Sequence, residues 1–207
     1  AIVENAQSGG SGGAVRAHAS LLLTVEHATN YIPAGFQKLG LPDDLIEDHV
    51  AWDIGALEVA RLMAGLLDAP LVAAPASRLL IDPNRDLDAH DLIPETAETT
   101  PVPGNLHLSE DERSARIGAY HAPFHAAIAQ VLEAHPRVEA LVSIHSFTPE
   151  LMGEKRPWHV GILHDSDARM ANAIIGHLRQ DPSLIVGRNQ PYAPAQGVYY
   201  SMDRHAR

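Results

Sequence analysis

A short apolar segment that ends in a charged pair constrains the fold of this chain more than any other feature. Residues 21–25 read Leu-Leu-Leu-Thr-Val, and Glu26 and His27 follow directly. Such a run is typical of a β-strand that is covered on both faces. Open α/β sheets bind their ligands at the carboxyl ends of such strands, so Glu26 and His27 are candidate site residues. The alternative is a strand end that is capped by a hydrogen-bonded histidine.

Strand and helix patterns alternate along the rest of the chain. Further strands are expected at residues 70–75, 140–144, 158–163 and 183–187. Capping or amphipathic patterns predict five helices. The first starts at residues 42–44 and the last near Tyr199. The three between them cover residues 56–67, Ser109 to about 135, and 166–178. Pro123 lies inside the third helix and predicts a kink or a restart there. This alternation predicts an α/β domain with a mostly parallel mixed sheet and helices on both faces.

The helix at residues 56–67 is expected to turn most of its large apolar side chains inward. The candidates are Leu57, Ala60, Leu62, Met63, Leu66 and Leu67. The chain is divided into a flexible Gly/Ser-rich segment at residues 1–19 and one domain at residues 20–207.

The composition excludes several classes of protein. There is no cysteine, so a metal site must rest on His, Asp and Glu. The net charge of −11 and the lack of a Lys/Arg block argue against nucleic acid or an anionic membrane as partners. No apolar run approaches the ~18 residues that a membrane span needs, and the polar N-terminus shows no secretory signal. We therefore expect a cytoplasmic protein; the oligomeric state is left open.

Two predicted strands end in histidine, which suggests a metal site. Val25 leads into Glu26 and His27, and Ile144 leads into His145. If both strands are parallel and central, two imidazoles and one carboxylate meet at the same sheet edge and leave one coordination position open. Asp53 and Glu26 are the candidate carboxylates. The alternative is that each histidine is hydrogen-bonded at the end of its element.

A second cluster, at residues 82–85, contains a candidate carboxylate-binding group. The guanidinium of Arg85 suits bidentate capture of a carboxylate, and Asn84 adds a neutral donor. Arg78 lies within reach if the intervening run is short and extended. The alternative is a structural arginine that satisfies loop carbonyls or Asp86. Ser146 lacks the G-x-S-x-G frame of a nucleophile, and we assign it to substrate binding instead.

His121 and His125 are spaced i, i+4 on a helix, as metal-chelating pairs are. Ala122 stands where a zinc peptidase has glutamate, so that motif is absent. These two histidines fit better as residues that pack near the core.

Five motifs together resemble the N-formylglutamate amidohydrolase family, over roughly residues 20–205. They are VEHATN (25–30), HVAWDIGA (49–56), SRLLIDPNR (77–85), IHSFTP (144–149) and RPWHVGI (156–162). The resemblance implies a three-layer phosphorylase/hydrolase-like fold, related to zinc carboxypeptidases and aspartoacylase-like hydrolases. It implies one Zn²⁺ ion with His27 and His145 as ligands, and Asn84 with Arg85 as the pair that holds a substrate carboxylate.

The chain departs from these relatives at two places. They have H-x-x-E at the first site, whereas residues 27–30 here read His-Ala-Thr-Asn, so Asp53 is the expected third ligand. They also continue into a strand that carries a glutamate base. This chain is expected to lack that part, which leaves Glu26 as the candidate base.

The resemblance implies a zinc-dependent amidohydrolase that removes an N-formyl or N-acyl group from an acidic amino acid such as N-formyl-L-glutamate, as in histidine degradation. Two alternatives remain open. One is a catalytically impaired protein that binds a carboxylate ligand in the same pocket. The other is a metal-free structural α/β domain.

Overall fold

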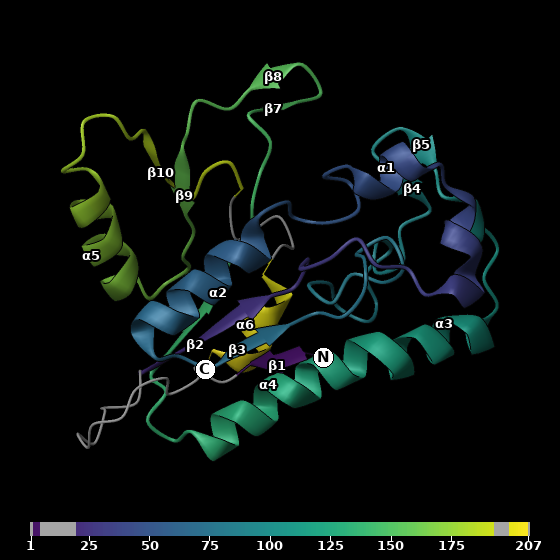
Figure 1. Cartoon of the computed structure of the whole chain (residues 1–207), viewed down its shortest axis with the longest axis horizontal. Coiled ribbons are helices and arrows are strands. Elements are labelled where there is room, and N and C mark those ends of the chain that lie inside the picture. The colour runs from purple at the N-terminus through teal and green to yellow at the C-terminus, as the bar shows by residue number, and fades with distance from the viewer. Residues whose placement is uncertain (1, 5–19, 193–198, 207) are drawn as a thin grey trace. The chain divides into compact units, whose positions relative to one another are not determined.

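The structure, a computed structural model, describes residues 2–4, 20–192 and 199–206 (Figure 1). The chain forms two compact units, one of residues 1–146 with 200–207 and one of residues 147–199. The predicted flexible segment lies mostly outside the described residues, although residues 2–4 form a strand. Within the described residues, no helix is long and apolar enough to cross a membrane.

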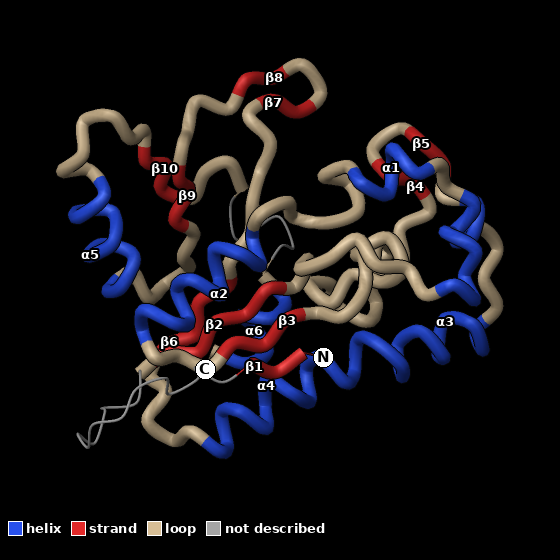
Figure 2. The backbone as a smooth tube through the Cα atoms, viewed as in Figure 1, coloured by secondary structure: helices blue, strands red, loops and turns tan. Residues whose placement is uncertain are grey.

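The larger unit is built on a four-stranded mixed sheet in the order β1-β3-β2-β6 (Figure 2). Strand β2 pairs in parallel with β3 on one side and with β6 on the other, whereas β1 pairs antiparallel with β3. Their bounds are Ile2–Glu4 for β1, Leu21–Val25 for β2, Leu71–Ala73 for β3 and Ala140–Ser143 for β6. The mostly parallel sheet predicted from the sequence is confirmed, with the two histidine-ended strands as neighbours.

Helices cover both faces of this sheet and make three layers. On one face, Leu23 and Val25 pack against α2 (Ala56–Leu67). On the other face, Leu22 and Val72 pack against α4 (Ala122–Ala134). Successive residues of β2 point to opposite faces, so both of its faces are apolar and buried. This confirms the predicted α/β class.

Helix α2 spans the predicted residues, but its buried face is narrower than expected. Leu57 and Ala60 are buried, whereas Leu62, Leu66 and Leu67 are 69%, 85% and 43% exposed. The inward orientation of these last three residues was predicted wrongly. At 3.6 residues per turn, Leu62 and Leu66 lie about 140° and about 180° around the helix from Leu57.

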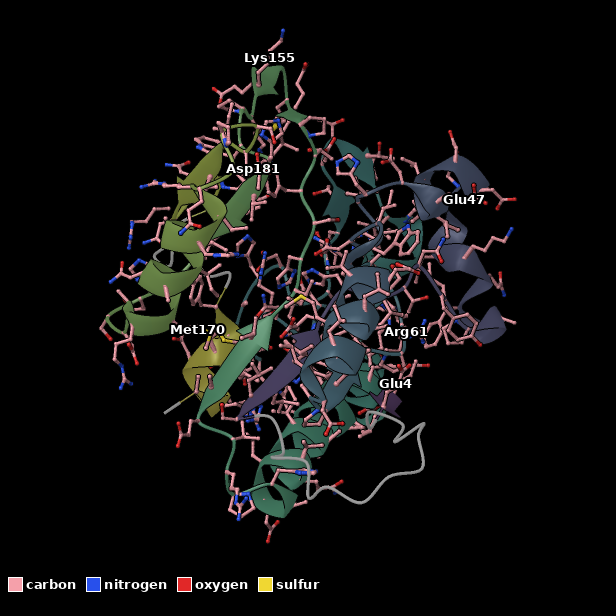
Figure 3. The ribbon with its side chains drawn as sticks, turned by 60° about the vertical axis from the view of Figure 1, so that its left-hand side comes forward. Glu4, Glu47, Arg61, Lys155, Met170 and Asp181 are labelled. Carbon is pink, nitrogen blue, oxygen red and sulfur yellow. The ribbon has the colours of Figure 1, made fainter. Side chains whose placement is uncertain are left out.

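The edge strand β1 is tied to α2 by an ion pair. Nε of Arg61 donates to both carboxylate oxygens of Glu4 at 3.1 Å, and its terminal nitrogen lies 2.7 Å from Oε1 (Figure 3). The pair is partly exposed, so it contributes little to stability but fixes where the edge strand lies on the helix.

The long helical region begins after Ser109 as the sequence predicts, but a π-helical turn before Pro123 takes the place of the predicted kink or restart. Ser109 and Glu112 form a capping box at the start of α3 (Glu110–Arg116). A π-helical turn, η3 (Ile117–His121), then joins α3 to α4, and Ala122 N–H donates to the Ile117 carbonyl. Pro123 lies at the start of α4, where a missing N–H is tolerated.

The segment between β3 and α3 is largely irregular but anchored. It contains the short strands β4 (Thr96–Ala97) and β5 (Thr100–Pro101) and the 3₁₀ turn η2 (Pro103–Asn105). The buried guanidinium of Arg116 donates to the carbonyls of Leu80 and Gly104 and to Oδ1 of Asn105. These bonds satisfy the backbone carbonyls of Leu80 and Gly104, which lie outside any strand pairing.

The described part of the larger unit also contains three short helical segments. The 3₁₀ segment η1 spans Ala34–Gly40 and is interrupted by left-handed backbone at Gln37, Lys38 and Leu39. Helix α1 spans Asp43–Glu47 and α6 spans Tyr200–His205. The predicted start of α1 and the predicted last helix are both confirmed.

The smaller unit has its own elements. A hairpin of β7 (Glu150–Leu151) and β8 (Glu154–Lys155) precedes β9 (Val160–Ile162), α5 (Arg169–Leu178) and β10 (Val186–Arg188). Strands β9 and β10 pair in parallel as a separate two-stranded sheet. Helix α5 begins at Arg169, three residues after the predicted start, and ends at the predicted Leu178; its N-cap Ala168 makes no side-chain hydrogen bond.

Candidate metal centre

The structure brings together His27, Asp53 and His145, the three predicted metal ligands. Because β2 and β6 are parallel neighbours, His27 and His145 leave the sheet at the same edge. Nδ1 of His27 lies 3.4 Å from Oδ2 of Asp53, and Nδ1 of His145 lies 2.7 Å from the same oxygen. One donor atom from each residue lies within 4.8 Å of the others.

Backbone hydrogen bonds fix Asp53 beside His27. The N–H of Asp53 donates to the carbonyl of His27 at 2.9 Å, and the Asp53 carbonyl accepts from Ala56 N–H at 3.1 Å. Gly55 lies between them with φ of +81°, a conformation that glycine adopts without strain, and the chain turns there into α2. The motif around Asp53 therefore places its carboxylate before the helix begins.

Each histidine is held on its far ring nitrogen. Nε2 of His27 lies 2.8 Å from Oδ1 of Asp82, and Nε2 of His145 lies 3.0 Å from the hydroxyl of Ser143 and 3.4 Å from Oε2 of Glu26. A histidine that donates from Nε2 keeps the lone pair of Nδ1 available. Carboxylates behind ligand histidines are the usual outer partners of protein metal sites.

The donor set fits a zinc-type ion. Nδ1 of His27 is buried and has no hydrogen-bond partner among the described residues. Ligands about 2.1 Å from a tetrahedral Zn²⁺ lie about 3.4 Å from one another. The His27–Asp53 separation matches that spacing, whereas the closer contact of His145 with Asp53 has to lengthen for an ion to enter. Two imidazoles and a carboxylate leave a fourth position open, as in catalytic zinc sites.

The site favours neutral imidazoles, the form that binds metals. Burial lowers the pKa of His27, and the nearby Arg78 charge lowers it further. The surrounding protein also lowers the pKa of His145 to about 4, chiefly through lost hydration, although 34% of the side chain is exposed. Burial alone would raise the pKa of Asp82, but the hydrogen-bonded His27 and the nearby Arg85 hold that pKa well below its usual range.

Glu26 lies behind His145. Its carboxylate is fully buried and accepts hydrogen bonds from Oγ1 of Thr24 at 3.0 Å and from the hydroxyl of Ser143. It faces Nε2 of His145, whereas Asp53 faces Nδ1 of the same ring. The structure therefore separates Glu26 from the three converging donor atoms by the imidazole of His145.

The two candidate arginines lie at different distances from the metal centre. A terminal nitrogen of Arg78 contacts Oδ1 of Asp53, and 26% of the Arg78 side chain is exposed. Nε of Arg85 donates to Oδ2 of Asp91 at 2.7 Å, and its NH1 lies 3.8 Å from Oδ2 of Asp82. Arg78 therefore borders the donor atoms, whereas Arg85 borders the carboxylate behind His27.

The remaining predicted residues, Asn84 and Ser146, make contacts within the larger unit. Oδ1 of the buried Asn84 accepts from the backbone N–H of Ser201 in α6 at 3.1 Å. The backbone N–H of Ser146 points at Oδ2 of Asp53 at 3.4 Å. Asn84 thus joins its loop to α6, and Ser146 contributes a backbone donor beside the metal centre.

Sequence reasoning did not assign the residues behind the histidines. Asp82 belongs to the 82–85 cluster, but nothing in the sequence links it to His27. Thr24 and Ser143 face each other in the β2–β6 register, and each stands two residues before a site residue in an otherwise apolar strand. Such a hydroxyl on a buried strand is the signal that could have identified them.

Comparisons with known proteins show which family and which solved structures the chain resembles. The family FGase, N-formylglutamate amidohydrolase, matches residues 19–207. The crystal structure of the gene product Atu2144 from Agrobacterium tumefaciens is similar with a TM-score of 0.89 and 39% identity, over 99% of this chain and 79% of that one. An N-formylglutamate amidohydrolase from Ralstonia eutropha JMP134 is similar with a TM-score of 0.67 and 22% identity, over 92% of this chain and 76% of that one, a likeness that shows the fold alone. No curated protein matches the chain.

Proposed function

The chain belongs to the N-formylglutamate amidohydrolase family, and on this basis we propose that it is a zinc-dependent amidohydrolase acting on an acidic N-acyl amino acid. N-formyl-L-glutamate is the first candidate substrate. Water adds to the acyl carbon and the amide C–N bond breaks, which releases formate and the free amino acid. The convergence of His27, Asp53 and His145 at one sheet edge is the observation that carries this proposal.

In this proposal His27, Asp53 and His145 hold one Zn²⁺ ion. When bound, the ion supplies a Lewis acid for the amide carbonyl and activates water for attack. Asp82 keeps a proton on Nε2 of His27, so that Nδ1 faces the ion.

Glu26 performs the matching task for His145. Its carboxylate accepts the Ser143 hydroxyl proton, and the Ser143 oxygen in turn accepts from Nε2 of His145. Glu26 therefore acts through His145, as a positioning residue, and would favour the tautomer whose Nδ1 is unprotonated when the ion replaces the contact of Nδ1 with Asp53. This assignment replaces the general base expected from the sequence.

The arginines supply the positive charge that an acidic substrate needs in a protein with net charge −11. Arg78 lies partly exposed beside Asp53, and we assign it to binding the acyl end of the substrate, where the amide bond breaks. Arg85 is assigned to the substrate carboxylate, which competes with Asp91 for its guanidinium. A bidentate carboxylate contact fixes orientation as well as affinity.

The test is formate release from N-formyl-L-glutamate by the full chain, with and without added Zn²⁺. N-acetyl-L-glutamate tests the acyl group, and N-formyl-L-leucine tests the need for an acidic side chain. We expect zinc-dependent release that is fastest with N-formyl-L-glutamate and is abolished by His145→Ala. Zinc and substrate binding without formate release would instead identify the protein as a carboxylate-binding member of the family, and no zinc binding would remove the basis of the proposal.

A further inference from the structure

A second group of histidines lies in the larger unit, apart from the metal centre. His121 and His125 are 2% and 1% exposed, and each holds a backbone carbonyl. Nε2 of His125 lies 2.9 Å from the carbonyl oxygen of Pro83, and Nε2 of His121 lies 3.0 Å from that of Arg85. Both bonds therefore end on one short loop, residues 82–85.

The orientation of these rings is fixed from the other side by α6. Because Nε2 of His125 donates to a carbonyl, its Nδ1 is an acceptor, and Nε2 of His205 donates to it at 3.0 Å. The His125 and His205 rings stack with centroids 5.2 Å apart. The Tyr200 ring packs against His125 at 5.1 Å and against His121 at 5.6 Å. One arrangement of protons thus satisfies both ring nitrogens of His125.

The imidazoles hold the loop without adding charge. Burial lowers the pKa of His125 to about 3 and also lowers that of His121, so both rings are neutral near pH 7. A lysine or arginine in either place would bring a positive charge near Asp82 and would compete with His27 for that carboxylate. Neutral donors avoid this competition while still satisfying buried carbonyl groups.

The other contacts of the loop lead to the metal centre. Oδ1 of Asp82 accepts from Asn84 N–H at 2.8 Å and from Nε2 of His27 at 2.8 Å. The carboxylate that orients His27 and the carbonyl that His125 holds belong to consecutive residues, Asp82 and Pro83. A shift of the loop backbone therefore moves the Asp82 oxygen that orients a metal ligand.

We propose that His121 and His125 are positioning residues of the metal centre, which hold loop 82–85 so that Asp82 orients His27. This inference rests on the metal site of the proposed function. A purely structural role for the two histidines predicts a change in stability alone. The positioning role predicts a change in metal affinity that is seen only while Asp82 is present.

A matched pair of variants separates the two roles. His125→Gln keeps an N–H donor that can reach the Pro83 carbonyl, whereas His125→Met has nearly the same length and no donor. Zn²⁺ affinity is measured on the full chain by competition with a chromophoric chelator. Loss of an outer partner typically weakens metal binding by about 10- to 100-fold. We expect His125→Met to bind Zn²⁺ at least about 10-fold more weakly and His125→Gln to stay within about threefold of the wild type.

A double-mutant cycle tests the route through Asp82. Asp82→Asn is expected to weaken Zn²⁺ binding, and the double variant with His125→Met is expected to bind no more weakly than Asp82→Asn alone. Wild-type zinc affinity in His125→Met, or losses that add in the double variant, would overturn the proposal. If His125→Met shows no cooperative unfolding transition and so is not folded, the same comparison of zinc affinities is made with His121→Met and His121→Gln.

A metal-free measurement keeps this inference separate from the proposed function. If the wild type binds no Zn²⁺, the proposed function fails, and the imidazole N–H signal of His27 then reports on the loop. That signal should persist in the wild type and in His125→Gln and be lost in His125→Met through exchange with solvent. Its persistence in His125→Met would refute the positioning role.

Discussion

His27 and Asp82 share a buried hydrogen bond of 2.8 Å although 55 residues separate them in the chain. The bond joins the end of β2 to loop 82–85, and it decides which nitrogen of His27 faces Asp53 and His145. Because the loop is itself held by α4 and α6, the geometry of the metal centre depends on residues in several elements of the larger unit.

Removal of a ligand histidine should remove the metal. We expect the wild type to carry about one Zn²⁺ per chain and His27→Ala to carry almost none, because only two of the three donors remain. Elemental analysis of the purified proteins measures this. His177→Ala, at an exposed position of α5, is the control and should keep the metal. Equal zinc in both variants would mean that His27 is not a ligand.

Asp91 should compete with the substrate for Arg85. Asp91→Asn removes the charge that holds Nε of Arg85, so KM for N-formyl-L-glutamate is expected to fall while kcat changes little. Arg85→Gln should raise KM and also lower kcat if the substrate is misplaced. Steady-state kinetics with the acidic substrate and with N-formyl-L-leucine gives both values. A rise in KM for Asp91→Asn would contradict the assignment of Arg85.

Stability of the metal-free protein should fall as the solution becomes acidic. The folded pKa of His125 is about 3, mainly through burial and then through the nearby His121, Arg204 and His205, and the unfolded value is about 6.5. The unfolded state therefore binds more protons between these values. The contribution of His125 is complete above about pH 6.5 and is lost as the pH falls toward 3, on the order of a few kcal/mol.

Urea unfolding from pH 7 to pH 4 measures this dependence. The slope of unfolding free energy against pH should be smaller in His125→Gln than in the wild type, because glutamine does not titrate. An identical slope in the two proteins would mean that His125 is not the neutral buried group described here.

A methyl group on Gly161 should disrupt the smaller unit. A Cβ there would lie 2.1 Å from the Gln190 carbonyl oxygen, which is backbone and cannot move aside easily. Gly176 is the matched control, since a Cβ on it meets nothing within 4 Å and alanine favours the helix by up to about 1 kcal/mol. We expect faster amide exchange of β9 and β10 in Gly161→Ala and unchanged or slower exchange of α5 in Gly176→Ala. Unchanged amide exchange of β9 in Gly161→Ala would show that the Gln190 backbone can move away from the added methyl group without destabilising the strand pair.

The elements that the sequence predicts well have strong local signals. The apolar run at residues 21–25, the helix at 56–67 and the cap at Ser109 each depend on neighbours in the chain, and each is found in the structure. The convergence of the two histidines follows from a rule about parallel strands once β2 and β6 are neighbours, a long-range pairing that the structure supplies. The local elements were therefore accessible from the sequence alone, whereas the meeting of the histidines was a conditional prediction.

The features that the sequence does not reveal depend on long-range packing. The outward direction of Leu62 and Leu66 is set by which face of α2 meets the sheet, and the small side chain of Ala60 occupies that face. Asp82 becomes the partner of His27 only through the fold of a segment with few regular elements. The separate pairing of β9 with β10 likewise cannot be read from their apolar pattern, which is the same as that of a strand in the main sheet.

The π turn at residues 117–121 rotates the side chains of α4 about the helix axis relative to those of α3. In an uninterrupted α-helix, residues five apart point about 140° away from each other, so Arg116 and His121 would face different neighbours. The i to i+5 bond of the π turn brings them close to the same side, where Arg116 holds the Leu80 carbonyl and His121 holds that of Arg85. Deleting Gly118 would restore a plain helix without removing any contacting side chain. Such a deletion would nevertheless turn Arg116 and His121 to different sides, and one of the two hydrogen bonds to residues 80–85 would be lost. The number of residues in the helix is therefore constrained as well as their identity.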